Sequence, residues 1–186
     1  ALEAAAAAGA DVRSAAPAMT QLLTRRGYRY KPEILRILSA AWQQGADLTP
    51  TWAAIAGCLR KSPTRSDALQ LVERALAKGT DTGPAEAALH DLLDLGDAYT
   101  REKAAALVTR LDLGRGRFED VAALLSHARH GVRYGTASAI EQWATRTAGP
   151  LHVLIPALQA RLSDPQAVVR NAAARAIAAV EAATKP

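Results

Sequence analysis

The sequence predicts an all-α protein, an α-solenoid of about five antiparallel helix pairs, from three observations. The chain of 186 residues is 49% hydrophobic but only 4% aromatic. Much of its apolar content is alanine, the strongest helix former. Proline stands at the start of six apolar-periodic runs, where its missing N–H is tolerated in the first turn of a helix. The helices also recur as pairs, with a step of about 33 to 35 residues.

Apolar residues at three- and four-residue spacing define the individual helices. The predicted helices cover residues 11–26, 32–44, 49–61, 64–78, 84–95, 98–112, 117–128, 131–147, 150–163 and 166–182. Short links, with glycines such as Gly27, Gly45 and Gly79, force successive helices to lie antiparallel and in contact. The approximate repeats are 11–44, 49–78, 84–112, 117–147 and 150–182, and we expect them to form a single domain, 1–186.

Stacking of the pairs follows from the apolar stripes. One pair cannot bury the stripes of both its helices, whereas a row of pairs buries them in one continuous core. Residues 1–9, "ALEAAAAAG", resemble the tail of a second helix such as "RAIAAVEAAT". We therefore expect the chain to be a fragment of a longer protein with a further repeat upstream.

A short motif recurs in the second helix of four of the five pairs. An arginine near its start is followed seven residues later by an aliphatic residue, in the pairs Arg65 and Val72, Arg101 and Val108, Arg133 and Ile140, Arg170 and Ile177. Seven residues make two helical turns, so both positions lie on about the same face. Alanines fill the turn between them, as in "RNAAARAI", and allow neighbouring helices to approach closely.

This pattern resembles the HEAT repeat family, and the last unit, "LHVLIPALQARLSDPQAVVRNAAARAIAAV", is the most similar part. It has Pro156 inside its first helix, Asp164-Pro165 at the turn, and Arg170 six residues after the aspartate. The resemblance implies a right-handed superhelix with an aspartate–arginine ladder that links neighbouring repeats. Carried over, Asp164 and Arg170 are the ladder pair. The corresponding arginines in the other repeats are Arg65, Arg101 and Arg133.

The match to the ladder is closest in this last unit. Leu59, Leu95 and His127 occupy the position of the acid in three other repeats, and Lys31 or Arg36 stands in for the first arginine. The step also fits tetratricopeptide repeats, but their pattern of Trp, Gly-Tyr and a final Pro is missing. The Thr-Pro-Leu-His signature of ankyrin repeats is missing too.

Charge and cysteine usage limit the possible partners and compartments. The net charge is +5, with 18 arginines and 5 lysines, which fits either affinity for nucleic acid or an acidic partner or a coding bias toward arginine. The single cysteine, Cys58, excludes an intrachain disulfide and a cysteine-rich zinc site. No uncharged apolar run approaches about 18 residues, so we expect no membrane span. Without a secretory signal pattern, we expect the protein in the cytoplasm.

The sequence offers no catalytic, cofactor or metal motif. His127 and His130 lie three residues apart but lack a third ligand. The spacing of Asp91, Asp94 and Asp97 does not match an EF-hand, so Asp97 is interpreted as a helix cap. A Walker-type phosphate loop and a Ser–His–acid arrangement are also missing.

We predict a non-catalytic scaffold that binds a protein or peptide, because stacked repeats offer extended concave surfaces. Second helices usually line that side, and arginine forks suit the carboxylates of an acidic partner. The candidate binding residues are Arg74, Arg110, Tyr134, Glu141, Arg146 and Arg175. The alternative is a nucleic-acid-binding protein, such as the HEAT-like DNA glycosylases for alkylated bases, with Glu141, Trp143 and Arg146 close in sequence. A third possibility is similarity to the HEAT-like subunits of bilin lyases.

Overall fold

The computed structural model describes residues 10–147 and 149–184, and within them the protein forms ten α-helices and no β-strand. The helices are α2 (Ala16–Thr24), α3 (Lys31–Gln43), α4 (Trp52–Leu59), α5 (Ser62–Ala77), α6 (Pro84–Leu95), α7 (Ala98–Gly114), α8 (Phe118–Leu125), α9 (His130–Ala144), α10 (Ile155–Gln159) and α11 (Ala167–Ala183). Short 3-10 segments lie at Arg13–Ala15, Thr49–Thr51, Leu151–Leu154 and Ala160–Ser163. The predicted all-α class is confirmed.

Prolines mark helix starts as the sequence predicts. Pro17, Pro32 and Pro63 lie in the first turns of α2, α3 and α5. The largest difference is in the predicted helix 150–163, which is a 3-10 segment, the short α10 and a second 3-10 segment. Pro156 lies in the first turn of α10. Because proline cannot donate a main-chain hydrogen bond, it favours a new helical start there over a continuous helix.

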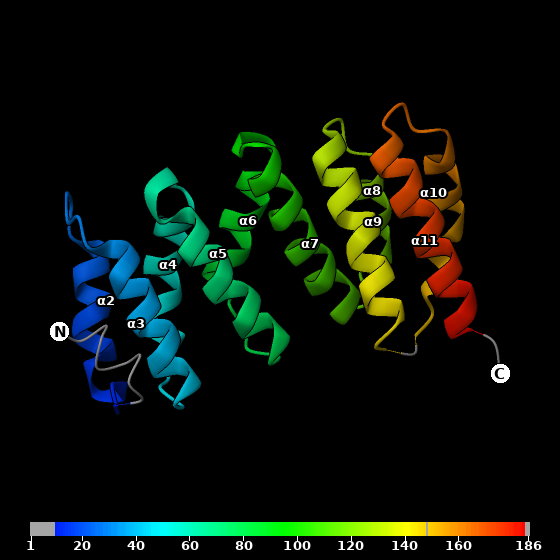
Figure 1. Ribbon diagram of the computed structural model, residues 1–186. Helices are drawn as coiled ribbons and strands as arrows, with labels where there is room; N and C mark the ends of the chain where they lie inside the picture. Colours follow the sequence, from blue (N-terminus) through cyan, green and yellow to red (C-terminus); the bar gives the residue numbers. More distant parts are fainter. Residues whose placement is uncertain (1–9, 148, 185–186) are drawn as a thin grey trace. The chain divides into compact units, whose positions relative to one another are not determined.

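The chain divides into two compact units, with the boundary between Ala88 and Leu89 in the sequence, inside α6. We call the first unit 1 and the second unit 2. The expectation of a single domain stays a prediction. In unit 1, α3 packs against α2 and α5, and α4 packs against α2 and α5. The second helices α3 and α5 therefore form one layer, and the first helices α2 and α4 form the other (Figure 1).

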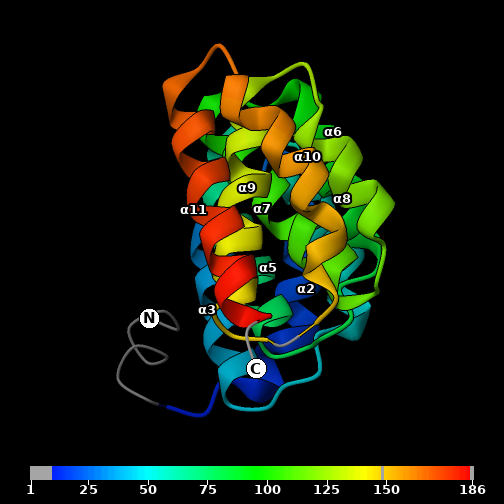
Figure 2. The ribbon, with the colours of Figure 1, turned by 90° about the vertical axis from the view of Figure 1, so that its right-hand side faces the viewer.

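Unit 2 has the same two-layer plan. The second helix α9 lies between α7 and α11, while α8 and α10 cover their other side (Figures 1 and 2). The core is made largely of small and medium side chains. It contains Leu113, Val121, Leu125, Ala137, Ile140, Ala144, Leu151, Leu154, Leu158, Ala172, Ala173, Ala176 and Val180. Alanine thus supplies much of the contact between second helices, as predicted from composition.

The aliphatic residues of the recurring motif lie toward the core. Val72, Val108 and Ile140 are fully buried, and Ile177 is half-buried against the core of unit 2. The two-turn spacing therefore identified the inner face of each second helix. The outer face of those helices, together with the arginine at their start, carries the candidate site.

Candidate interaction surface

Each motif arginine reaches back to the end of the preceding segment. Arg65 Nε donates to the Leu59 carbonyl at 3.0 Å, and Arg101 donates to that of Gly96. Arg170 Nη1 donates to the Asp164 carbonyl at 2.7 Å. The last carbonyls of a helix have no partner within it and carry a partial negative charge, so a cation stabilises them. In the first pair Lys31, nearly buried, does the same for the Leu23 carbonyl.

Arg133 has a second partner, and it corrects the predicted ladder. Its Nε donates to Asp164 Oδ2 at 2.7 Å and its Nη2 to Oδ1 at 2.9 Å, while Nη1 donates to the carbonyls of His127 and Ala128. The acid–base link between neighbouring repeats is therefore Arg133–Asp164, and Arg170 acts within its own repeat on the main chain of Asp164. The prediction chose the wrong arginine because Asp164 follows the first helix and faces the repeat before it.

The Arg133–Asp164 pair is buried and held in one geometry by several hydrogen bonds. The side chains are 9% and 1% exposed, and Asp164 Oδ1 also accepts from the Gln166 main-chain N–H at 3.0 Å. The hydrogen bonds from Arg133 lower the pKa of Asp164, against the opposing effect of burial. This bidentate arrangement is the geometry for which the guanidinium fork is suited.

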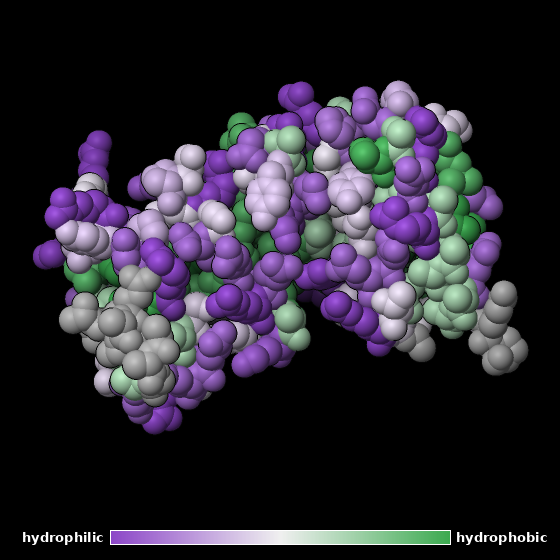
Figure 3. Space-filling model, in the orientation of Figure 1, coloured by the Kyte–Doolittle hydropathy of each residue, from purple (hydrophilic) through white to green (hydrophobic). Residues whose placement is uncertain are grey.

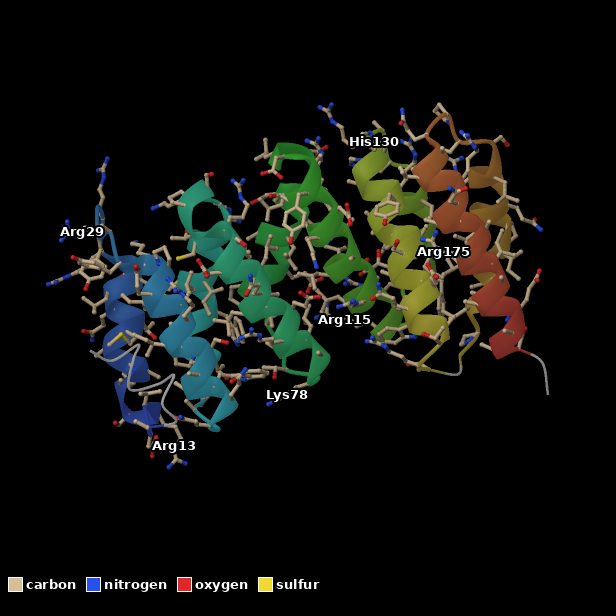
Figure 4. All side chains as sticks on the ribbon, in the orientation of Figure 1. Arg13, Arg29, Lys78, Arg115, His130 and Arg175 are labelled. Atoms are coloured by element: carbon tan, nitrogen blue, oxygen red, sulfur yellow. The ribbon has the colours of Figure 1, made fainter. Side chains whose placement is uncertain are left out.

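Three predicted binding arginines also contact a neighbouring second helix. In unit 2, Arg110 Nη2 donates to Gln142 Oε1 at 2.6 Å. Arg175, labelled in Figure 4, donates through Nε to Glu141 Oε1 and Oε2 at 3.1 and 3.0 Å. In unit 1, Arg74 Nη1 donates to Ser39 Oγ at 2.8 Å. These side chains therefore bridge neighbouring repeats, and their heads are held in place on the outer face.

The other two candidates are placed differently. Tyr134 is half-buried and packs against the core of unit 2 through part of its ring. Arg146 is exposed just beyond the end of α9. In unit 2 the candidate binding residues therefore lie on α7, α9 and α11 and just beyond the end of α9. Figure 3 shows hydrophilic side chains spread over the faces of these helices.

Two glycines bring α7 and α9 unusually close. A Cβ on Gly131 would lie 3.3 Å from the Ala98 carbonyl oxygen. A Cβ on Gly135 would lie 3.1 Å from both the carbonyl carbon and Cα of Glu102, with the carbonyl oxygen closer still. Glycine is therefore required at position 135, where a Cβ would overlap the Glu102 backbone, and a Cβ at position 131 would make a tight contact with the Ala98 carbonyl. The close contact fixes the spacing of the exposed side chains on both helices.

The residues proposed for metal binding and for the glycosylase alternative are not brought together as such a site in the described part of the chain. Within it, no three His, Cys, Asp or Glu side chains are grouped so as to hold a metal ion. Glu141, the acid of the glycosylase alternative, has both carboxylate oxygens engaged by Arg175. Trp143 packs against the core. Among the described helices, none is long and apolar enough to cross a membrane.

Several contacts were not foreseen from sequence. The glycine pair lies in "HGVRYG", where a GxxxG-type spacing could have indicated close helix packing. Asp112, nearly inaccessible, pairs with Arg117 at 2.6 Å across the turn between α7 and α8. Sequence reasoning also did not identify two basic segments as a possible site. They are residues 24–30, "TRRGYRY", and 60–61, "RK", and neither contains an acid.

Comparison with known proteins supports the class that these features define, a helical-repeat protein. No family model and no curated protein sequence matches this chain. Among solved structures, one engineered protein is similar over 98% of this chain and 88% of its own, at 18% identity and a TM-score of 0.58. A second engineered protein covers 88% of this chain and 80% of its own, at 19% identity and a TM-score of 0.53.

A designed armadillo repeat protein is similar over 96% of this chain and 85% of its own, at 16% identity and a TM-score of 0.54. At these identities the likeness concerns the fold alone. The chain therefore has an all-α, solenoid-like repeat fold, and its assignment to HEAT repeats in particular stays a prediction.

Proposed function

We propose that this chain is a non-catalytic, HEAT-like scaffold that binds a protein or peptide through the outer faces of its second helices. In unit 2 this surface comprises α7, α9 and α11. Stacked repeats present extended surfaces of this kind, which suit elongated partners. The fold makes such a function reasonable but does not identify it, so the proposal depends on the surface itself.

The observation that supports it most is the set of bridges between neighbouring second helices. Arg110 is held by Gln142 and Arg175 by Glu141, and the glycine contact fixes the spacing of α7 and α9. Side chains that are already ordered lose less conformational entropy on binding, so a preorganised surface binds more tightly. Arg110 and Arg175 are thus accessible to a partner and already held in place.

The surface favours a partner that carries carboxylates among other polar groups. Arg146 and Arg175 are exposed, and Lys103 and Arg110 are half-exposed, while Glu141 supplies an opposite charge. A guanidinium bound on one edge to Glu141 retains further N–H donors for a partner carboxylate. The single cysteine, Cys58, is free and buried, which fits the reducing cytoplasm that we expect for the protein.

The test is affinity capture with the full chain, comparing one double variant with a matched control. In Arg146→Glu/Arg175→Glu the charge is inverted on the proposed surface, and in Arg13→Glu/Arg129→Glu the same change is made at exposed positions elsewhere. We expect a specific partner to be lost by the first variant and retained by the second. Equal retention by both, with unchanged circular dichroism, would contradict the proposal.

A further inference from the structure

Two turns in unit 1 account for the net positive charge of the chain. Residues 24–32, "TRRGYRYKP", contain four cations, and residues 59–66, "LRKSPTRS", contain three, with no acid in either segment. Together they sum to +7 against a net charge of +5 for the chain. The remaining 16 basic and 18 acidic residues sum to −2. The excess of positive charge over negative charge is therefore local, which a general coding bias toward arginine does not explain.

These two turns lie at the same end of unit 1. The first helices α2 and α4 pack against each other, and each turn follows the end of one of them (Figure 1). Lys31 from the first turn binds the Leu23 carbonyl near the end of α2, and Arg65 from the second turn binds the Leu59 carbonyl at the end of α4. The cations of both turns therefore form one basic surface, which we call the basic end.

Within the basic end, some cations bind main-chain carbonyls at helix ends and others are exposed to solvent. Lys31 and Arg65 cap the preceding helices. Arg25, Arg26, Arg29 and Lys61 are exposed. The first acids beyond the turns, Glu33 and Asp67, both face Arg36 at 3.9 Å. The exposed cations are thus available to an anionic partner.

Two tyrosines stand among these cations. The rings of Tyr28 and Tyr30 meet edge to face at 5.8 Å between centroids. Arg29 Cζ lies 4.6 Å from the centroid of the Tyr30 ring, and the Arg29 guanidinium donates to the Tyr30 hydroxyl. Tyr30 is 44% exposed, and Arg29 lies at the outer end of the unit (Figure 4). The turn thus presents an ordered aromatic ring within a field of positive charge.

We propose that the basic end of unit 1 binds single-stranded nucleic acid, with phosphates on Arg25, Arg26 and Lys61 and a base stacked near Tyr30. A positive surface with an aromatic platform is the combination that single strands use, because their bases are free to stack. A duplex hides its bases, and an acidic peptide has none. The site uses residues of unit 1 that the proposed scaffold surface does not, so either proposal can fail without the other.

The test measures binding of the full chain to a fluorescent oligothymidylate of about 12 nucleotides by anisotropy, over a series of salt concentrations. The variant Arg25→Gln/Arg26→Gln/Lys61→Gln should lose most of the binding and reduce the slope of log K against log salt by about 2, since each of the three phosphate contacts contributes about 0.7. The control, Arg13→Gln/Arg115→Gln/Arg129→Gln, removes the same charge from exposed positions outside both proposed surfaces. Equal loss in both variants would overturn the proposal.

A second variant tests the aromatic part. Tyr30→Ala should weaken binding to the single strand by about tenfold, the loss expected from one stacked base, whereas Tyr30→Phe keeps the ring and should bind almost as the unaltered chain. A duplex of equal length and a polyglutamate peptide serve as competitors. If either competes better than the unlabelled single strand, or if Tyr30→Ala binds normally, the surface is not a single-strand site.

Discussion

The contacts between second helices differ in kind between the two units. In unit 1, the buried residues of α3 and α5 include large aliphatic side chains such as Leu35, Leu38 and Leu71. In unit 2, α9 and α11 meet their neighbours largely through glycine and alanine. These residues are Gly131, Gly135, Ala137, Ala139, Ala172, Ala173 and Ala176. Large side chains leave room for repacking, whereas backbones in near contact do not.

The polar contacts between neighbouring repeats also differ between the two units. Unit 2 links its last two repeats with the buried Arg133–Asp164 pair. In unit 1 the corresponding pair of second helices is linked by Arg74 with Ser39, and by Arg36 with Asp67 at 3.9 Å. Unit 2 therefore depends on a few positions of exact geometry, and unit 1 on the sum of many apolar contacts. Substitutions should separate these two modes of stabilisation.

Removal of Asp164 should have the largest effect. Asp164→Ala leaves the nearly buried Arg133 charge without its carboxylate, and loss of one partner from a buried pair costs about 3–5 kcal/mol. We expect the free energy of unfolding, measured with urea and circular dichroism, to fall by that order. The control, Glu181→Ala, removes an exposed acid from α11. It should change the free energy of unfolding by less than about 0.5 kcal/mol. Equal effects of the two substitutions would show that the pair is not important for unit 2.

Acid should weaken the same pair. The pKa of Asp164 in the folded protein lies below its ordinary value of 3.8, chiefly because of the hydrogen bonds from Arg133. The unfolded chain therefore takes up the proton first as the pH falls. The stabilisation is complete above that ordinary value and is lost as the pH falls below it, through the lowered value of the folded state.

Urea unfolding at several pH values, compared with Asp164→Asn, tests this sign. The difference in stability between the two proteins should shrink as the pH drops below the ordinary pKa of an aspartate. Asp11 is the matched control, because Arg13 lowers its pKa to about 2 although it is exposed. Since solvent screens an exposed pair, Asp11→Asn should alter the pH profile much less. A constant difference for Asp164→Asn across this range would contradict the assignment.

Local signals predicted much of the fold. Prolines, glycines and apolar spacing located ten helices, and the two-turn spacing after each arginine found the inner face at Val72, Val108 and Ile140. Such features depend on residues close in sequence. The broken helix around Pro156 was missed because the proline was placed inside one continuous helix, 150–163, although a new helical start there was equally compatible with its chemistry.

The candidate site was less predictable, because its contacts join different repeats. Arg133 and Asp164 lie 31 residues apart, and Arg175 and Glu141 lie 34 apart. The sequence motif marked the arginines as important but could not assign their partners, since that requires the stacking geometry of the repeats. It assigned Asp164 to Arg170, the nearer arginine, whereas the acid points to the preceding repeat.

Closing the space between α7 and α9 should have a smaller but clear effect. Gly135→Ala introduces a methyl group against the Glu102 backbone, which must move because it cannot rotate away. Overpacking of this type costs about 1–3 kcal/mol. Gly57→Ala is the matched control, since Gly57 lies within α4 and its Cβ would meet no atom within 4 Å. That substitution should stabilise the chain by about 0.5–1 kcal/mol. Destabilisation by both would show that the close approach is not the cause.

The bridge between Glu141 and Arg175 should contribute least. Arg175 is 51% exposed and Glu141 29%, so solvent and salt weaken their attraction. A double-mutant cycle with Glu141→Ala and Arg175→Ala should give a coupling energy of about 0.2–1 kcal/mol, decreasing as salt is added. A coupling of zero at low salt would mean that Arg175 is not held by Glu141 in solution. The binding surface of unit 2 would then lose its preorganisation there, while the buried Arg133–Asp164 link would be unaffected.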